Sequence, residues 1–167
     1  NLSSTRALRD VTVDFGADYF AAAVGEVNVV EKMKSVNAVI GGEGNGGVIY
    51  PELHYGRDAL VGVGLFLTYL CESQCTCSEL KSKFPIYCMS KNKIQLDEST
   101  DVDEILTNLA EKFKDEQITA IDGVKIDFAE GWVHLRKSNT EPIIRIYSEG
   151  KTEAEAERLA QMVKDSL

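Results

Sequence analysis

The sequence predicts two small domains of different classes, an α/β domain followed by an α+β domain. In the first half, short apolar stretches alternate with amphipathic stretches of helical period, which is typical of helices layered on a largely parallel sheet. In the second half, apolar and polar residues alternate with period two between tight turns, as in an antiparallel sheet. A polar segment separates the halves near Phe84. We therefore predict domains at residues 1–84 and 85–167.

The first domain should begin with a helix, because Ser3 and Ser4 precede apolar residues at helical spacing and Gly16 supplies a stop. A strand is expected at 18–23, followed by a helix and a buried strand at 38–40. The apolar side chains that this second helix should present are Val29, Val30 and Met33.

Residues 60–70 are apolar all round, and we interpret them as a buried helix. The stretch is too short to cross a bilayer, which needs about 20 residues. Asp58 stands where an N-cap or first-turn acid would stabilise the start of this helix. His54 is interpreted as a satisfied loop histidine rather than a catalyst.

The second domain should hold one helix, four or five antiparallel strands and a second helix. A strand is expected at 86–94, and Asp101 with Glu104 should cap the first helix. The dipeptide Asp122-Gly123 predicts a hairpin turn. The strands expected next are 118–121, 124–128 and the two that flank residues 137–142, and Thr152 with Glu155 should form the capping box of the last helix.

Composition excludes several classes of function. The 167 residues include 44% hydrophobic residues and carry a net charge of −9, from 18 basic and 27 acidic residues. This balance argues against a nucleic-acid or anionic-membrane partner, so an anionic ligand must be bound locally. The N-terminus lacks the pattern of a signal peptide. The four cysteines match neither a zinc ribbon nor a CxxC motif, so we expect reduced thiols, a cytoplasmic location and no metal site.

The stretch Arg-Lys-Ser-Asn-Thr-Glu-Pro-Ile-Ile-Arg at 136–145 is a candidate phosphate-binding loop. If the apolar residues on both sides share the buried face, alternation places Arg136 and Arg145 together on the other face. Ser138, Thr140 and main-chain N–H groups around Asn139 would complete the ligand set. Charge-assisted hydrogen bonds contribute roughly 1.5 to 3 kcal/mol each, so two arginines could hold a phosphate dianion. The alternative is an exposed hairpin tip with unrelated charges.

A second candidate loop is Gly-Gly-Glu-Gly-Asn-Gly-Gly at 41–47. It formally contains GxGxxG, but a strand-like segment follows instead of a helix, so we reject dinucleotide binding. Glu43 could accept hydrogen bonds from neighbouring hydroxyls, and Asn45 can donate and accept, which suits a polyol. A flexible turn is the alternative reading of these residues.

The two loops together resemble those of the α-D-phosphohexomutases, the family of phosphoglucomutase, phosphomannomutase and phosphoglucosamine mutase. The pattern R-x-S-x-T-E-P-x-x-R matches the phosphate-binding loop of their last domain, with Asn139 where many members have Gly and Lys137 where many have Pro. The other loop is similar to the E-x-N-G-G form of archaeal-type members, whose counterparts elsewhere read G-E-x-S-G-H and contact sugar hydroxyls. Many members also carry a basic residue before the Val24-Gly25 match, and we hypothesise that Arg57 replaces that charge near the sugar.

The resemblance implies that the chain is the third and fourth domains of a phosphohexomutase, with the third domain truncated at its N-terminus and the fourth similar to the TATA-binding protein. The implied reaction interconverts hexose 6-phosphate and hexose 1-phosphate through a bisphosphorylated intermediate. The family's catalytic serine loop and its magnesium loop do not occur in this sequence. Mg²⁺ and catalysis would therefore belong to N-terminal domains of the same protein, and we assign this chain no catalytic residue or metal ligand and expect it to be inactive by itself.

Its expected partners are a phosphosugar and those N-terminal domains, with no nucleic acid and no membrane. A non-catalytic phosphosugar-binding or regulatory module is the main alternative, and a purely structural interaction domain is a third. Which hexose is used, glucosamine, mannose or glucose, is left open by the residues, as is the oligomeric state.

Overall fold

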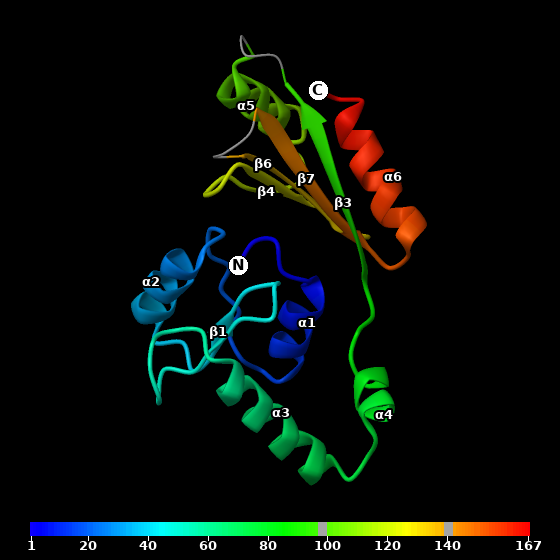
Figure 1. Ribbon diagram of the computed structural model, residues 1–167. Helices are drawn as coiled ribbons and strands as arrows, with labels where there is room; N and C mark the ends of the chain where they lie inside the picture. Colours follow the sequence, from blue (N-terminus) through cyan, green and yellow to red (C-terminus); the bar gives the residue numbers. More distant parts are fainter. Residues whose placement is uncertain (97–99, 139–141) are drawn as a thin grey trace. The chain divides into compact units, whose positions relative to one another are not determined.

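The computed structural model describes residues 1–96, 100–138 and 142–167. The chain forms two compact units, Asn1–Ile86 and Tyr87–Leu167 (Figure 1). The division between them lies close to Phe84, where the polar segment of the sequence ends.

Unit 1 consists mainly of helices, and side chains cap the N-termini of α1, α3 and α4. Thr5 caps the first helix by accepting a hydrogen bond from the N–H of Ala7, so the cap lies one residue beyond the expected Ser3 and Ser4. A small core forms around Val29 and Met33, as predicted, with Ala22 and Ile49. The elements of this unit are α1 (Arg6–Asp14), α2 (Glu26–Val36), β1 (Gly41–Gly42), β2 (Val48–Ile49), α3 (Ala59–Ser73) and α4 (Cys77–Ser82).

The expected parallel sheet does not form among the described residues of unit 1. Segments 18–23 and 38–40 are not strands, and β1 pairs with β2 in an antiparallel two-stranded sheet. Unit 1 does combine helices with short strands, as the α/β class predicts, but the positions and the parallel pairing of the strands were predicted wrongly. The predicted burial of 38–40 was also wrong, because Val39 is 79% and Ile40 51% exposed. Ala22 of segment 18–23 is 3% exposed, although that segment is not a strand. Burial does not supply the paired neighbour that a strand requires.

Helix α3 forms where predicted, and Asp58 is its N-cap, accepting hydrogen bonds from the N–H groups of Leu60 and Val61. Its burial was predicted wrongly: none of its residues is buried, and Leu60 is 83% exposed and Leu67 54%. Apolar composition favours a covered helix, but it does not specify which segment covers it. Among the described residues, no helix is long and apolar enough to cross a membrane.

Unit 2 is built on an antiparallel sheet in the order β3-β7-β6-β5-β4. The four-or-five-stranded prediction is therefore confirmed with five strands. The turn between β4 and β5 contains Gly123 at a φ of +69°, as the Asp122-Gly123 pair predicts. The elements are β3 (Cys88–Gln95), α5 (Val102–Lys112), β4 (Gln117–Thr119), β5 (Val124–Asp127), β6 (Trp132–Lys137), β7 (Ile143–Gly150) and α6 (Glu153–Lys164).

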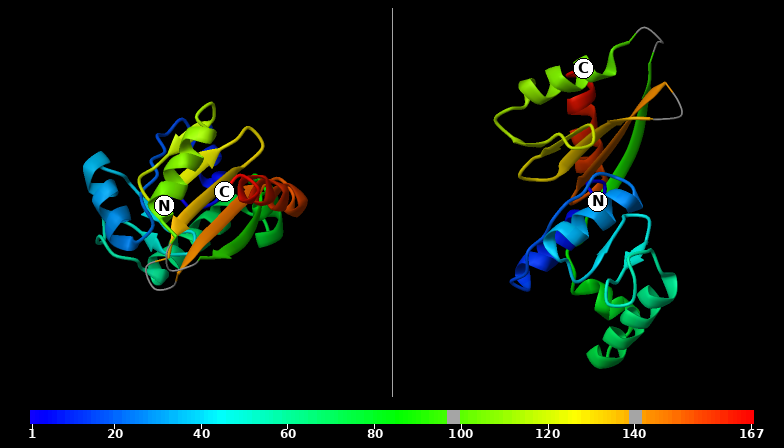
Figure 2. Two further views of the ribbon diagram at one scale, coloured as in Figure 1. Left: turned by 90° about the horizontal axis from the view of Figure 1, so that it is seen from above. Right: turned by 90° about the vertical axis from the view of Figure 1, so that its left-hand side faces the viewer.

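Both helices of unit 2 pack on one face of the sheet (Figure 2). Asp101 caps α5, and Thr152 with Glu155 forms the predicted capping box of α6. The core joins apolar side chains of the two helices to alternate residues of β5, β6 and β7. Its buried members are Val102, Leu106, Leu109, Val124, Ile126, Phe128, Val133, Leu135, Ile144, Ile146, Leu159, Ala160 and Val163. On β6 the other face carries Trp132, His134 and Arg136.

Candidate functional site

The two predicted arginines meet across neighbouring strands of unit 2. In the register of β6 and β7, Arg136 lies directly opposite Arg145. Residues directly opposite each other in an antiparallel pair project from the same face of the sheet. Leu135 and Ile144 are completely buried on the helix-covered face, so the arginines lie on the opposite face. The prediction that alternation would place them together is confirmed.

The surroundings of Arg136 hold its guanidinium at the strand end. Its Nε lies 3.5 Å from Oδ2 of Asp122, and this nitrogen is buried without a hydrogen-bond partner among the described residues. Ser138 is 8% exposed, and its N–H donates to the carbonyl of Ile143 at 3.0 Å, which closes the loop at its base. The predicted ligands Asn139 and Thr140 lie outside the described residues.

His134 precedes the arginine pair on the same face of β6. It is 1% exposed, and its Nε2 lies 2.6 Å from the carbonyl oxygen of Asp122. Burial lowers the pKa of His134, so the neutral imidazole is favoured. The positive charge beside the loop therefore comes from arginine, and not from this histidine.

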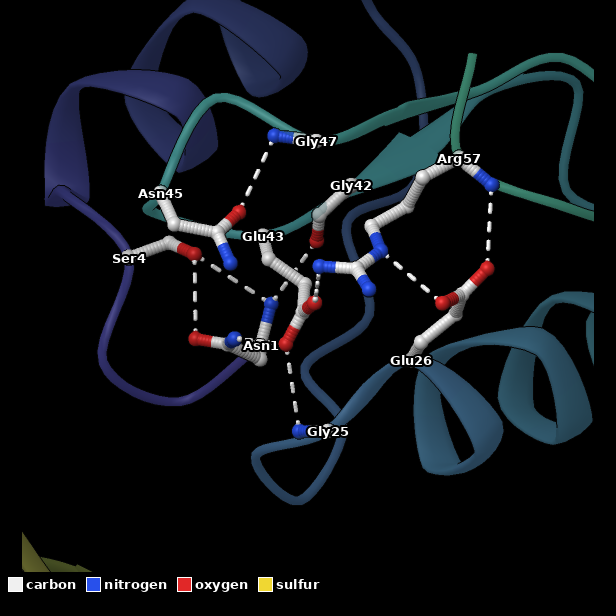
Figure 3. A network of polar contacts seen from close by, with 9 residues as sticks. All are labelled: Asn1, Ser4, Gly25, Glu26, Gly42, Glu43, Asn45, Gly47 and Arg57. Atoms are coloured by element: carbon white, nitrogen blue, oxygen red, sulfur yellow. Dashed lines mark hydrogen bonds and ion pairs between the residues drawn. The ribbon is translucent and has the colours of Figure 1, made fainter.

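In unit 1, Glu43 is held by contacts from three directions (Figure 3). Its Oε1 accepts hydrogen bonds from the side-chain amide of Asn1 at 3.0 Å and from the N–H of Gly25 at 3.2 Å. Its Oε2 lies 3.5 Å from Nη1 of Arg57. The side chain is only 6% exposed. These contacts orient the carboxylate strongly and leave Oε2 as the oxygen with capacity for a further donor.

Arg57 joins Glu43 to Glu26 at the start of α2. The N–H and Nε of Arg57 donate to the two carboxylate oxygens of Glu26 at 3.0 and 2.8 Å (Figure 3). The backbone N–H of Arg57, and then its side chain, lower the pKa of Glu26. Arg57 itself is 45% exposed, so its guanidinium is fixed by carboxylates on two sides while remaining open to a ligand.

An open depression of about 480 Å³ lies beside Arg57 and the glycine-rich loop. Its lining residues are Glu26, Asn45, Gly46, Gly47, Arg57, Asp58 and Ala59. Asn45 is exposed, and its Oδ1 accepts a hydrogen bond from the N–H of Gly47 at 3.0 Å. A Cβ at Gly47 would come within 2.6 Å of Cδ of Arg57, so only glycine lets the arginine lie across the loop.

His54 contributes to the start of α3, as its interpretation as a satisfied loop residue predicted. Its Nε2 lies 3.1 Å from Oδ2 of Asp58. The N–H of Val61, and then the His54 side chain, lower the pKa of Asp58. Both side chains are therefore engaged in capping the helix beside the depression.

The role of Glu26 was not predicted from the sequence. An acid in the first turn of a helix is usually explained by the helix dipole, and its pairing with an arginine 31 positions away has no local signal. In the described ranges, no group of three or more His, Cys, Asp or Glu side chains is arranged to hold a metal ion.

Both units match domains of the same protein family. The profile of "Phosphoglucomutase/phosphomannomutase, alpha/beta/alpha domain III" matches residues 1–87, and that of "Phosphoglucomutase/phosphomannomutase, C-terminal domain" matches residues 92–166. The two matched domains follow each other along the chain, domain III before the C-terminal domain. The chain belongs to the phosphoglucomutase/phosphomannomutase family.

Relatives of the chain carry mutase names. A "Phosphoglucomutase/phosphomannomutase" of Thermococcus kodakarensis is 36% identical over 163 residues, covering 96% of this chain and 35% of the relative. A "Phosphoglucosamine/phosphogalactosamine mutase" of Sulfurisphaera tokodaii is 38% identical over 143 residues, covering 84% of this chain and 31% of the relative. The chain thus spans about a third of the length of these relatives.

Solved structures share the fold at low sequence identity. A phosphoglucomutase/phosphomannomutase family protein of Burkholderia thailandensis matches with a TM-score of 0.71 and 22% identity, over 96% of this chain and 34% of that one. An N-acetylphosphoglucosamine mutase of Aspergillus fumigatus, solved with GlcNAc-6P and magnesium, matches with a TM-score of 0.60 and 11% identity, over 95% and 38% of the two chains.

Proposed function

We propose that this chain is the substrate-binding C-terminal part of a phosphohexomutase that interconverts hexose 6-phosphate and hexose 1-phosphate through a bisphosphorylated intermediate. The observation that carries the proposal is the direct opposition of Arg136 and Arg145 at the base of the loop. Two guanidiniums on one face can chelate the oxygens of a phosphate ester, which a single surface arginine does not do strongly. The names of the relatives support the same reaction class.

Such a reaction needs a holder for the phosphate that does not react. In unit 2 this role falls to Arg136, Arg145 and Ser138, with Asn139 and Thr140 as further expected ligands. Binding energy from this remote group positions the reacting phosphate, so these residues should affect the rate as well as the affinity.

The reaction also needs contacts to sugar hydroxyls that work in both orientations of the sugar. In unit 1 we assign this role to Glu43, Asn45 and Arg57. The carboxylate of Glu43 is oriented before the ligand arrives, and Arg57 is exposed beside the depression. A site ordered in advance loses less entropy on binding.

Magnesium and the phosphoryl-donating serine would be supplied by domains outside this sequence. Bound Mg²⁺ would neutralise charge that develops on the transferred phosphoryl group. The residues of this chain would bind and orient the sugar phosphate. Glucosamine, mannose and glucose phosphates are the candidate substrates, and the mutase names of the relatives include glucosamine and mannose forms.

Titration of the 167-residue chain with glucose 1-phosphate and with a bisphosphorylated hexose tests the binding assignment. We expect saturable binding that requires the phosphate and is lost in Arg136→Ala. Lys137→Ala is a matched control, because Lys137 is the next cation along the chain and is exposed. In the register of β6 and β7 it lies opposite Ile144, and not opposite Arg145. Equal loss in both variants, or no saturable binding, would contradict the assignment.

A non-catalytic phosphosugar-binding or regulatory module would give the same titration. The two functions are separated by assaying the protein together with N-terminal domains that carry a serine loop and a magnesium loop. Conversion of at least one of the three hexose 6-phosphates supports the mutase, whereas binding without conversion supports the module. Mutase activity of the 167-residue chain with no other protein added would contradict the division of roles.

A further inference from the structure

We propose that Lys93 is a third cation of the anion site and binds the phosphate dianion together with Arg136 and Arg145. Lys93 lies some forty residues before the loop, so no local sequence pattern connects it with the arginines. This proposal rests on the proposed function, because it adds a ligand to the same site. It is carried by the register of three neighbouring strands.

Lys93, Arg145 and Arg136 form one row across β3, β7 and β6. Lys93 lies directly opposite Arg145 in the pairing of β3 with β7, and Arg145 lies directly opposite Arg136 in the pairing of β7 with β6. Directly opposite residues in such pairs have Cα atoms about 4.5 to 5.5 Å apart. Long cationic side chains from such positions reach a common anion.

The three side chains project from the same face of the sheet. The next residue of β3, Ile94, packs against the core and lies opposite Ile144, which is completely buried. Successive residues of a strand point to opposite faces, so Lys93 lies on the face away from the helices. That is the face of both arginines.

Strand β3 is also tied to the end of the loop. The N–H of Leu96 donates to the carbonyl of Pro142 at 3.0 Å, and the side-chain amide of Gln95 lies 3.4 Å from the same oxygen. These contacts hold the strand of Lys93 beside Pro142, on one side of the loop base. Ser138 and Arg136 lie on the other side.

The other lysines of this face have partners, and Lys93 does not. The ammonium of Lys91 lies 5.4 Å from the ring centre of Tyr147. Lys125 lies 4.8 Å from the ring centre of Trp132 and 3.5 Å from the carboxylate of Asp127. Within the part of the chain that the structure describes, the exposed Lys93 makes no hydrogen bond or ion pair.

The row places three cationic side chains next to one another. Like charges directly opposite each other destabilise a sheet. Asp122 partly offsets the charge of Arg136 at 3.5 Å, but it lies on the far side of the row from β3. A phosphate ester, which carries two negative charges near neutral pH, would remove this repulsion. The ammonium of Lys93 would act as a single point charge beside the two planar guanidinium groups.

The test is the affinity of the 167-residue chain for inorganic phosphate and for glucose 1-phosphate, measured by calorimetry at low and at physiological salt. We expect Lys93→Met to weaken binding roughly tenfold at low salt, because one charge-assisted contact is lost. The loss should shrink at higher salt because screening weakens the contribution of this exposed charge. Lys93→Arg should restore most of the affinity.

Lys91→Met is the matched control, because it removes the same charge from the same face of the same strand, one row away. The phosphate affinity of this variant should lie within about twofold of that of the unmodified chain, because the ammonium of Lys91 lies over the ring of Tyr147. If Lys93→Met binds as tightly as the unmodified chain while Arg136→Ala has lost binding, the role of Lys93 is refuted and the proposed function stands. If the unmodified chain binds neither ligand, both are refuted.

Discussion

Replacing Gly123 with alanine should destabilise unit 2 and disturb the positions of Arg136 and Arg145. Gly123 has a φ of +69°, and a Cβ there would lie 2.1 Å from the carbonyl oxygen of Leu135 and 2.9 Å from Cα of Arg136. The left-handed conformation costs a non-glycine residue about 1 to 2 kcal/mol. Relieving overlap with a backbone that cannot rotate away should add about 1 to 3 kcal/mol.

The expected loss is therefore about 2 to 5 kcal/mol. For a domain of this size, each kcal/mol lowers the melting temperature by about 4 to 8 °C, so a decrease of at least about 8 °C is expected. Trp132 is the single tryptophan of the chain, is completely buried and lies in unit 2, so its fluorescence reports the unfolding of that unit. Phosphate affinity measured below the transition should also fall, because β6 must shift at Arg136.

Gly16→Ala is the control for this substitution. Gly16 has a similar φ of +71°, but it belongs to unit 1 and a Cβ there meets nothing within 4 Å. It should leave the Trp132 transition unchanged. A Gly123→Ala variant that melts within about 2 °C of the unmodified chain would refute the reasoning about the turn, since even the conformational term predicts more.

Three further variants test the caps, the buried histidine and the arginine clamp. Thr152→Ala should lower the stability of unit 2 by about 1 kcal/mol in urea unfolding followed by Trp132 fluorescence, and an unchanged midpoint would contradict the capping box. Because the folded pKa of His134 is lowered, its contribution to stability is complete above the unfolded value of about 6.5 and decreases as pH falls toward the folded pKa. A His134→Asn variant should lose this part of the pH dependence, and an identical dependence would count against it. Glu26→Gln removes the charge that holds the Arg57 side chain, and it should reduce kcat/KM of the protein assayed with its N-terminal domains by roughly tenfold. Misplacing a substrate-orienting group by about 1 Å can cost up to about 100-fold in rate. An unchanged kcat/KM would show that Arg57 does not need Glu26 to hold it in place.

The local sequence pattern was sufficient to predict most of the structure of unit 2. Alternation of apolar and polar residues predicted the strands around 136–145, and parity then placed Arg136 and Arg145 on one face, as the register shows. The turn at Gly123 and the capping box at Thr152 were also correct. In these cases neighbours in sequence interact, so backbone periodicity and the chemistry of single residues determine the geometry.

Unit 1 was predicted less well, because its structure depends on neighbours that are distant in sequence. The apolar segments 18–23 and 38–40 were read as strands, but the described residues offer them no strand partner. The apolar helix α3 was expected to be buried, but Leu60 and Leu67 are exposed. Hydrophobicity indicates that a segment favours contact with other apolar groups, and it does not identify those groups.

The sequence by itself determined the composition of the candidate site: two arginines facing one way, a carboxylate and an amide among glycines, and the family to which these motifs belong. The tertiary structure decided which other residues join them. Glu26 reaches Arg57 through the placement of α2 beside the loop, and Lys93 joins the arginines because β3 pairs with β7 at one particular register. The physical reason is that side-chain periodicity follows from local backbone geometry, whereas strand order and helix placement follow from the packing of segments far apart in the chain.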